Sequence, residues 1–194
     1  MRATQWCVMT MGLAAVLLRT ANASAQTNIQ QTTDSVTVGA ALGGVVNFGG
    51  SGSGSWDVSV LVERFVVSTW HVRAEIARGT FVLDVPKGAP RQAVSLTRVE
   101  CGAIDTTPAW MPGQVVGYVG GGMGGYRFGF NPAAGANSDF TRFGVYAVAG
   151  MMAPRDTPFS IAVQEKVHIV RGPGSEPGVF HIVASASIGA RLRF

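Results

Sequence analysis

Charge and cysteine are both scarce in this chain. Charged residues make up 13% of its 194 residues and hydrophobic residues 47%, which is apolar for a water-soluble domain. No run of lysine and arginine is dense enough to neutralise several phosphates, and this excludes nucleic acid as a partner. Of the two cysteines, Cys7 lies in an N-terminal apolar run that we expect to be removed, so Cys101 has no partner for an internal disulfide.

Motifs that gather catalytic groups or metal ligands are also missing. The sequence contains no CxxC, no HExxH and no calcium-binding loop. The stretch GGGMGG, residues 120–125, precedes no predicted helix and therefore lacks the context of a nucleotide-binding loop. We accordingly expect no catalytic residue, no cofactor and no metal site.

Long apolar runs are confined to the N-terminus. Arg2 precedes an apolar run from Trp6 to Leu18, and Ala23-Ser24-Ala25 follows as a small-residue cleavage pattern. The run is too short to span a bilayer and is typical of a secretory signal. The predicted organisation is a signal peptide over residues 1–25, a short tail over 26–34 and one folded domain over 35–194.

Alternation of apolar and polar residues with a period of two fills the rest of the chain. This period is typical of β-strands, and stretches rich in glycine and proline separate most of the segments. Each segment is about as long as a tilted strand that crosses a bilayer, or somewhat longer. The fold class that they predict is all-β, an eight-stranded antiparallel up-and-down barrel. The predicted strands are Val36 to Phe48, Trp56 to Val66, Thr69 to Ala77, Arg91 to Cys101, Val115 to Phe128, Thr141 to Met152, Phe159 to Val170 and Val179 to Phe194.

Most of the predicted strands have one apolar face. In the last strand, Ile182, Ile188 and Leu192 share one face, while Ser185 and Arg191 share the other. A soluble barrel would bury the apolar face in its core, whereas a transmembrane barrel would turn it to lipid and enclose a polar interior. Alternation alone does not distinguish these two arrangements.

Aromatic residues favour the transmembrane arrangement. On the lipid-facing parity they gather at the strand ends, as the two interfacial girdles of a membrane barrel do. The plainer explanation is that aromatic residues favour strands in general. The predicted girdles comprise Phe48, Trp56, Tyr126, Phe143 and Phe180 at one end and Trp70, Tyr118, Phe159 and Phe194 at the other.

Charged residues of both signs fall mainly on the opposite parity, where we predict ion pairs inside the barrel. In the fourth strand we turn Arg98 inward, because an arginine that faces the bilayer midplane costs about 2–4 kcal/mol. The predicted lumen ion-pair residues are Asp57, Glu63, Arg73, Glu75, Arg98, Arg127, Lys166 and Arg191.

Two further expectations depend on the register of the last two strands. If the turn GPGSEPG, residues 172–178, is symmetrical, His168 faces His181 as a polar pair inside the barrel. A metal between these imidazoles would need a third ligand, and none is evident. The same register places Glu165, which shares its parity with lipid-facing residues, at the outer interface, where an acidic group costs little.

The last residues, ASIGARLRF, resemble the C-terminal insertion signal of bacterial outer-membrane β-barrel proteins. The stretch YVGGGMGGYRF, Tyr118 to Phe128, is similar to the glycine-aromatic strand of the small eight-stranded OmpA/OmpX-like barrels. The resemblance implies a monomer in the cell outer membrane, with both termini in the periplasm. It also implies that the partners of the chain are outer-membrane lipid and the barrel-assembly machinery. The residues that would carry the assembly signal are Ile188, Ala190, Leu192 and Phe194.

Three functions stay open at this stage. Side chains just fill an eight-stranded barrel, so we expect no wide pore, and a non-enzymatic role in envelope structure or in surface contacts through the extracellular loops is favoured. An alternative is a barrel enzyme that modifies outer-leaflet lipid, which would need a nucleophile and a base at a lipid-accessible site. A further alternative is a soluble secreted barrel that binds a small apolar ligand.

Overall fold

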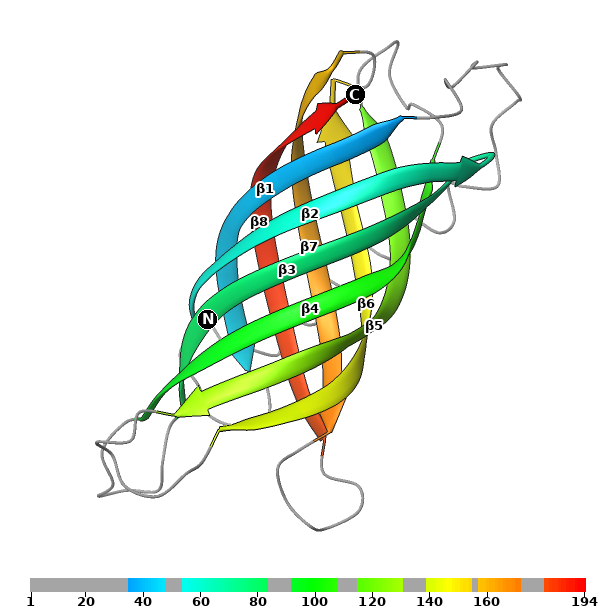
Figure 1. The fold of residues 1–194 in the computed structure, drawn as a ribbon. Helices are drawn as coiled ribbons and strands as arrows, with labels where there is room; N and C mark the ends of the chain where they lie inside the picture. Colours follow the sequence, from blue (N-terminus) through cyan, green and yellow to red (C-terminus); the bar gives the residue numbers. More distant parts are fainter. Residues whose placement is uncertain are drawn as a thin grey trace.

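The chain forms a closed barrel of eight strands (Figure 1). The computed structural model describes residues 35–47, 54–83, 92–107, 115–130, 139–154, 157–171 and 180–194, so the predicted signal peptide and tail lie outside the described residues. In the described part, no helix is long and apolar enough to cross a membrane. The strands are β1 (Val36–Asn47), β2 (Ser55–Val67), β3 (Trp70–Leu83), β4 (Gln92–Thr106), β5 (Val116–Phe130), β6 (Phe140–Ala153), β7 (Phe159–Arg171) and β8 (Phe180–Arg193).

Each strand pairs antiparallel with its neighbours in the sequence, and β1 closes the barrel against β8. The row of paired residues that starts at Thr37 passes through all the strands and returns to β1 at Asn47, ten residues further along. A shear of this size tilts the strands by roughly 40° to the barrel axis. The slant of the strands is visible in Figure 1.

The two ends of the barrel differ. At one end, the terminal end, the backbone of Phe194 exchanges two hydrogen bonds with Val36. The turn of Ser68 and Thr69 also lies at the terminal end, where Ser68 has a φ of 57° and no glycine or proline is needed. At the opposite end, the loop end, residues 48–54, 84–91, 131–138 and 172–179 connect successive strands.

Side chains alternate between the inside and the outside along the strands, and the apolar set lies outside. In β2, Val58, Val60 and Val62 are 38–47% exposed, whereas Asp57 and Glu63 on the other face are buried. The predicted fold class, an eight-stranded barrel with a polar interior, is therefore confirmed. A soluble barrel, which would bury the apolar face and expose the polar one, does not fit this arrangement.

Two predicted strand ends are too early. β3 continues from Ala77 to Leu83, and β4 continues from Cys101 to Thr106. Both extensions pass through glycines, Gly79 and Gly102, which interrupt the hydrophobic pattern but still pair through their backbone. Backbone pairing, which needs no side chain, sets the strand length here.

Apolar side chains pack inside the barrel toward both ends. At the loop end a packed cluster includes Val45, Phe81, Leu96 and Phe128, all of them buried. At the terminal end Val116 packs with Met152 and Ala162. The polar interior lies between these two layers.

Glycines on the inner face of β5 let the strands approach closely. A Cβ atom added to Gly122 would lie 2.1 Å from the carbonyl oxygen of Cys101 on β4. On β4, a Cβ atom added to Gly102 would lie 2.6 Å from the hydroxyl oxygen of Tyr146. The space beside Gly102 is occupied by the inward-facing Tyr146.

Candidate functional site

Charged side chains fill the middle of the barrel, and their charges balance. The buried acids are Asp57, Glu63, Glu75 and Glu100, and the buried bases are Arg73, Arg98, Lys166 and Arg191. Burial of an isolated charge is costly, whereas a buried pair with good geometry compensates much of that cost. Four negative and four positive charges therefore make an interior without net charge, in the part of the chain that the structure describes.

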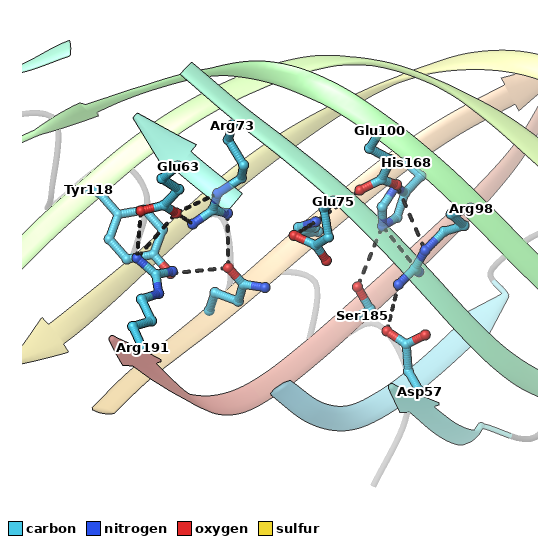
Figure 2. Close-up of polar contacts among 12 residues, drawn as sticks. Asp57, Glu63, Arg73, Glu75, Arg98, Glu100, Tyr118, His168, Ser185 and Arg191 are labelled. Atoms are coloured by element: carbon cyan, nitrogen blue, oxygen red, sulfur yellow. Dashed lines mark hydrogen bonds and ion pairs between the residues drawn. The ribbon is translucent and has the colours of Figure 1, made fainter. Parts of the chain in front are cut away.

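The first group of contacts surrounds Glu63 near the terminal end (Figure 2). Arg73 Nε donates a 2.7 Å hydrogen bond to Glu63 Oε1, and Arg191 Nη1 lies 3.3 Å from both carboxylate oxygens of Glu63. Arg191 Nη2 also donates to the Tyr118 hydroxyl at 2.8 Å. The Tyr118 hydroxyl and Arg73 Nη1 both donate to Gln164 Oε1, at 3.1 and 3.0 Å. Glu63 thus contacts both arginines, and the side-chain amide of Gln164 links this group to β7.

The second group lies nearer the loop end. Lys166 Nζ is 2.7 Å from Glu75 Oε2 and 2.8 Å from Glu100 Oε2. Arg98 Nη2 lies 2.5 Å from Asp57 Oδ2. These pairs join β7 to β3 and β4, and β4 to β2, so they cross the lumen rather than follow its wall.

His168 connects an acid to a serine within the second group. Its Nδ1 lies 3.0 Å from Glu100 Oε1, and its Nε2 lies 3.4 Å from Ser185 Oγ. Glu100 Oε1 has no hydrogen-bond partner, so the Nδ1 contact is a close approach without hydrogen-bond geometry. This order of contacts, serine to histidine to acid, is that of a nucleophilic triad. Arg98 Nη1, at 3.5 Å from Nε2, approaches the same nitrogen.

The site around His168 is sealed. Ser185 is 8% exposed and His168 is fully buried. Tyr126, whose hydroxyl lies 3.2 Å from His168 Nδ1, belongs to the apolar cluster of the loop end. Within the described residues, the histidine and the serine are therefore buried among interior side chains.

Tyr118 and Tyr126 correct the predicted girdles. Both lie inside the barrel, 1% and 0% exposed, on the inward face that β5 shares with its glycines. The Tyr118 ring lies beneath Arg73 and Arg191, with guanidinium carbons 5.2 and 4.8 Å from the ring centroid. The Tyr118 hydroxyl finds polar partners inside the barrel, as buried tyrosine hydroxyls usually do. The apolar pattern of β5 is too weak to show this.

The remaining girdle residues lie outside where they are described. Trp56, Trp70, Phe143, Phe159 and Phe194 are 47–85% exposed. The side chain of Phe180 and the whole of Phe48 lie outside the described part. Their interfacial role stays a prediction.

Arg127 corrects the predicted set of lumen ion pairs. It lies on the outer face of β5 and pairs with Asp139, its Nη2 atom 3.1 Å from Asp139 Oδ2, and both side chains are exposed. The reason is parity, because the inward tyrosine at 126 forces residue 127 outward. The other seven predicted residues, Asp57, Glu63, Arg73, Glu75, Arg98, Lys166 and Arg191, are buried in the interior.

The predicted pairing of His168 with His181 is wrong. His168 lies opposite Val183, and His181 lies opposite Val170. The connection between β7 and β8 is centred one residue later than the symmetrical turn assumed, which moves each partner by two positions. The side chain of His181 is not described. No group of metal-ligating side chains occurs among the described residues.

Glu165 is also misplaced by the sequence analysis. It is the seventh of the 13 residues of β7, and it shares the outward parity of Val163 and Val167. At roughly 2.5 Å of height per residue, either end of β7 is about 15 Å away. The carboxylate therefore lies in the middle of the apolar band and not at the outer interface.

Several interior residues were not predicted. Glu100 could have been found, because it shares its parity with Arg98 on β4. Gln164 and Tyr146 carry no charge pattern and become important only through residues on other strands, so the sequence offers no signal for them. Tyr146 lies beneath Lys166, whose Nζ is 5.1 Å from the ring centroid.

Comparison with solved structures identifies the fold. The chain superimposes on Neisserial surface protein A with a TM-score of 0.63 at 15% sequence identity, over 84% of this chain and 98% of that one. The chain has the fold of a small outer-membrane β-barrel. The N-terminal barrel domain of Pseudomonas aeruginosa OprF gives a TM-score of 0.54 at 14% identity, over 84% of this chain and 100% of that one. Yersinia pestis Ail, in complex with the heparin analogue sucrose octasulfate, gives a TM-score of 0.52 at 15% sequence identity, over 83% of this chain and 97% of that one.

The sequence comparisons add nothing to this likeness. No model of a known protein family matches the chain, and no curated protein matches it. The outer-membrane barrel fold therefore rests on shape, together with the apolar outside and the polar inside described above. A barrel of this kind is an integral protein of the bacterial outer membrane, and its apolar face turns to lipid.

Proposed function

We propose that this outer-membrane barrel is non-enzymatic and contributes to envelope structure or to surface contacts through its extracellular loops, without a wide pore. The observation that carries the proposal is the filled lumen. Ion pairs cross the middle of the barrel, and apolar side chains pack inside it toward both ends. A barrel of eight strands has little room beyond what its own side chains occupy.

Conductance across a planar bilayer tests the absence of a pore. The purified barrel is expected to give no stable current steps at neutral pH, while a known porin added to the same bilayer gives them. A matched variant, Lys166→Ala, removes the amine that holds Glu75 and Glu100 and should be the first change to admit ions. Stable current steps from the wild-type chain would contradict the proposal.

A second candidate is an enzyme that modifies outer-leaflet lipid, and one observation favours it. The contacts from Ser185 to His168 to Glu100 follow the order of a nucleophilic triad. The sealed environment of Ser185 argues against this candidate, because a lipid ester would have to enter between packed strands.

Labelling with a fluorophosphonate separates the two candidates. A nucleophilic serine would be labelled in the folded barrel, and the label would disappear in the Ser185→Ala variant. Under our proposal, the wild-type barrel and the Ser185→Ala variant show the same weak background labelling. The matched control is Ser187→Ala, which removes an inward serine two residues away. Labelling that depends on Ser185 alone would establish the enzyme.

A further inference from the structure

Two outward arginines share one row of paired residues on the loop-end half of the barrel. Arg78 on β3 is paired with Thr97 on β4, and Thr97 is paired with Arg127 on β5. These three strands are neighbours in the barrel (Figure 1). All three side chains lie on the outer face, and both arginines are exposed. Neighbouring strands are about 5 Å apart, so the two arginine backbones are about 10 Å apart. Two long cationic side chains thus flank the short side chain of Thr97.

The row lies near the outer edge of the apolar band. Arg78 is paired with Val58, and Trp56, a predicted girdle residue, is the next outward residue of β2 toward the loop end. A row of paired residues climbs ten residues toward the loop end in one circuit of the barrel. This is about 3 Å per strand, so Arg127 stands about 6 Å nearer the loop end than Arg78. Arginine side chains near an interface extend toward it, which brings both guanidinium groups to the level of lipid headgroups.

The positive charge of this row is not fully balanced by the described residues. Arg78 makes no hydrogen bond and no ion pair with any of them. Arg127 Nη2 lies 3.1 Å from Asp139 Oδ2, but the two side chains are 65% and 46% exposed, and an exposed pair of this kind contributes little. Phosphate is a common anionic group of membrane lipids, and its oxygens accept strong hydrogen bonds from guanidinium groups. A phosphate between the two arginines would balance the remaining charge.

A recess in the outer wall adjoins the row on its membrane side. In the row two residues nearer the terminal end, Val99 on β4 and Phe143 on β6 are paired with Gly125 on β5. A Cβ atom added to Gly125 would meet nothing within 4 Å. The side chains of Val99 and Phe143 are 59% and 85% exposed, so they stand out from the wall on either side of the glycine. An acyl chain laid along β5 over Gly125 would gain van der Waals contact with both.

We propose that the row of Arg78, Thr97 and Arg127, together with the recess over Gly125, binds a phosphorylated lipid of the outer leaflet. The headgroup phosphate accepts hydrogen bonds from the two guanidinium groups, and one acyl chain lies in the recess. The leaflet is the outer one because the family resemblance places the loop end outside. The proposal rests on the membrane position of the barrel and not on its filled lumen, so this test and the conductance test can fail independently.

Arg171, which is also outward and exposed at the loop end, lacks these features. Its partner on β8 is Phe180, and the whole of β6 separates it from β5. The next outward residue of β7 toward the terminal end is Ile169, which is paired with Val145 and Ile182. These three side chains are 43–54% exposed, so bulky residues occupy the place that Gly125 leaves open beside Arg127. Arg171 therefore serves as the matched control for a charge outside the site.

Fluorescence quenching in vesicles tests the site. Cys101 is the one cysteine of residues 26–194, and it lies outward on β4, two residues beyond Val99 toward the terminal end. A bimane label on Cys101 therefore reports on the membrane end of the recess. The barrel is folded into phosphatidylcholine vesicles that contain a small fraction of either phosphatidic acid or phosphatidylcholine with a nitroxide in the acyl chain. The ratio of quenching by these two lipids measures the enrichment of the phosphate lipid at the label. Heat-modified gel mobility verifies that each variant has folded.

We expect phosphatidic acid to be enriched at the label of the wild-type barrel. Arg78→Gln and Arg127→Gln should each reduce this enrichment roughly fivefold, because each removes one cationic contact with the headgroup. Gly125→Leu fills the recess without a change of charge and should also reduce the enrichment. Arg171→Gln removes the same charge at the same end of the barrel and should leave the enrichment unchanged.

Three results would overturn the inference. The first is equal quenching of the wild-type label by the two lipids. The second is an equal loss from Arg171→Gln and Arg78→Gln, which would show a general attraction to the charged rim, or an enrichment that Gly125→Leu leaves at the wild-type level. The third concerns inorganic phosphate, which is added as a soluble competitor. If it displaces phosphatidic acid at the same bulk concentration, the arginines bind a free anion and not a lipid headgroup.

Discussion

Neutralising Glu63 is expected to be the most damaging single change in the interior. Glu63 is the acid that contacts both Arg73 and Arg191, and all three side chains are buried. The change Glu63→Gln keeps the shape of the side chain but leaves two guanidinium groups without an anion. Loss of one partner from a buried ion pair typically costs about 3–5 kcal/mol, and we expect a loss of that size in the free energy of unfolding.

Urea unfolding in detergent micelles measures this loss, with the shift in gel mobility between folded and unfolded chain as the signal. The matched control is Asp139→Asn, an acid-to-amide change in the exposed pair with Arg127, which should cost about 0–1 kcal/mol. A second variant, with Glu63, Arg73 and Arg191 all changed to leucine or methionine, should recover much of the stability. If Glu63→Gln unfolds at the same urea concentration as the wild type, the interior charges are not coupled as described.

Three further changes are expected to have defined effects. Gly122→Ala should lower the free energy of unfolding by about 1–3 kcal/mol or prevent folding, because the added Cβ would lie 2.1 Å from a backbone oxygen. The control Gly125→Ala, which has no atom within 4 Å of the added Cβ, should be tolerated. The urea midpoints of the two variants are compared. Tyr118→Phe should cost about 1–3 kcal/mol in the same assay, because Arg191 Nη2 loses its acceptor. Phe194→Ala should reduce insertion in cells but leave folding into micelles unchanged, since the contact of residue 194 with Val36 is through the backbone.

The class of fold was accessible from the sequence because it depends on a period of two. Val58, Val60 and Val62 face one way and Asp57 and Glu63 the other whichever strand β2 pairs with. Arg98 was placed inside by a different argument, the cost of an arginine that faces the bilayer midplane, and it is buried. Where the local pattern is poor, as in β5, the rule could not decide, and Tyr118 and Tyr126 were turned the wrong way.

The contacts inside the barrel were less accessible because they depend on register. A turn centred one residue later separates His168 from His181 and moves Glu165 relative to its neighbours on β8. The alternation of apolar and polar residues fixes which face a side chain lies on, but it does not fix where the turn between two strands is centred. Partners such as Gln164, which is brought to Arg73 from across the lumen, follow only once all the registers are set.

The two groups of buried charges are not neutral by themselves, so we expect them to be coupled electrostatically. The terminal-end group has one acid, Glu63, for two arginines, whereas the loop-end group has three acids for Arg98 and Lys166. Counted over these carboxylates, arginines and the lysine, each group therefore carries an excess charge opposite to that of the other. In a medium of low dielectric constant these excesses attract across the lumen. A change that removes an acid from the loop-end group reduces that excess, whereas Glu63→Gln increases the excess at the terminal end. Position in the barrel, and not burial alone, then decides which acid matters most.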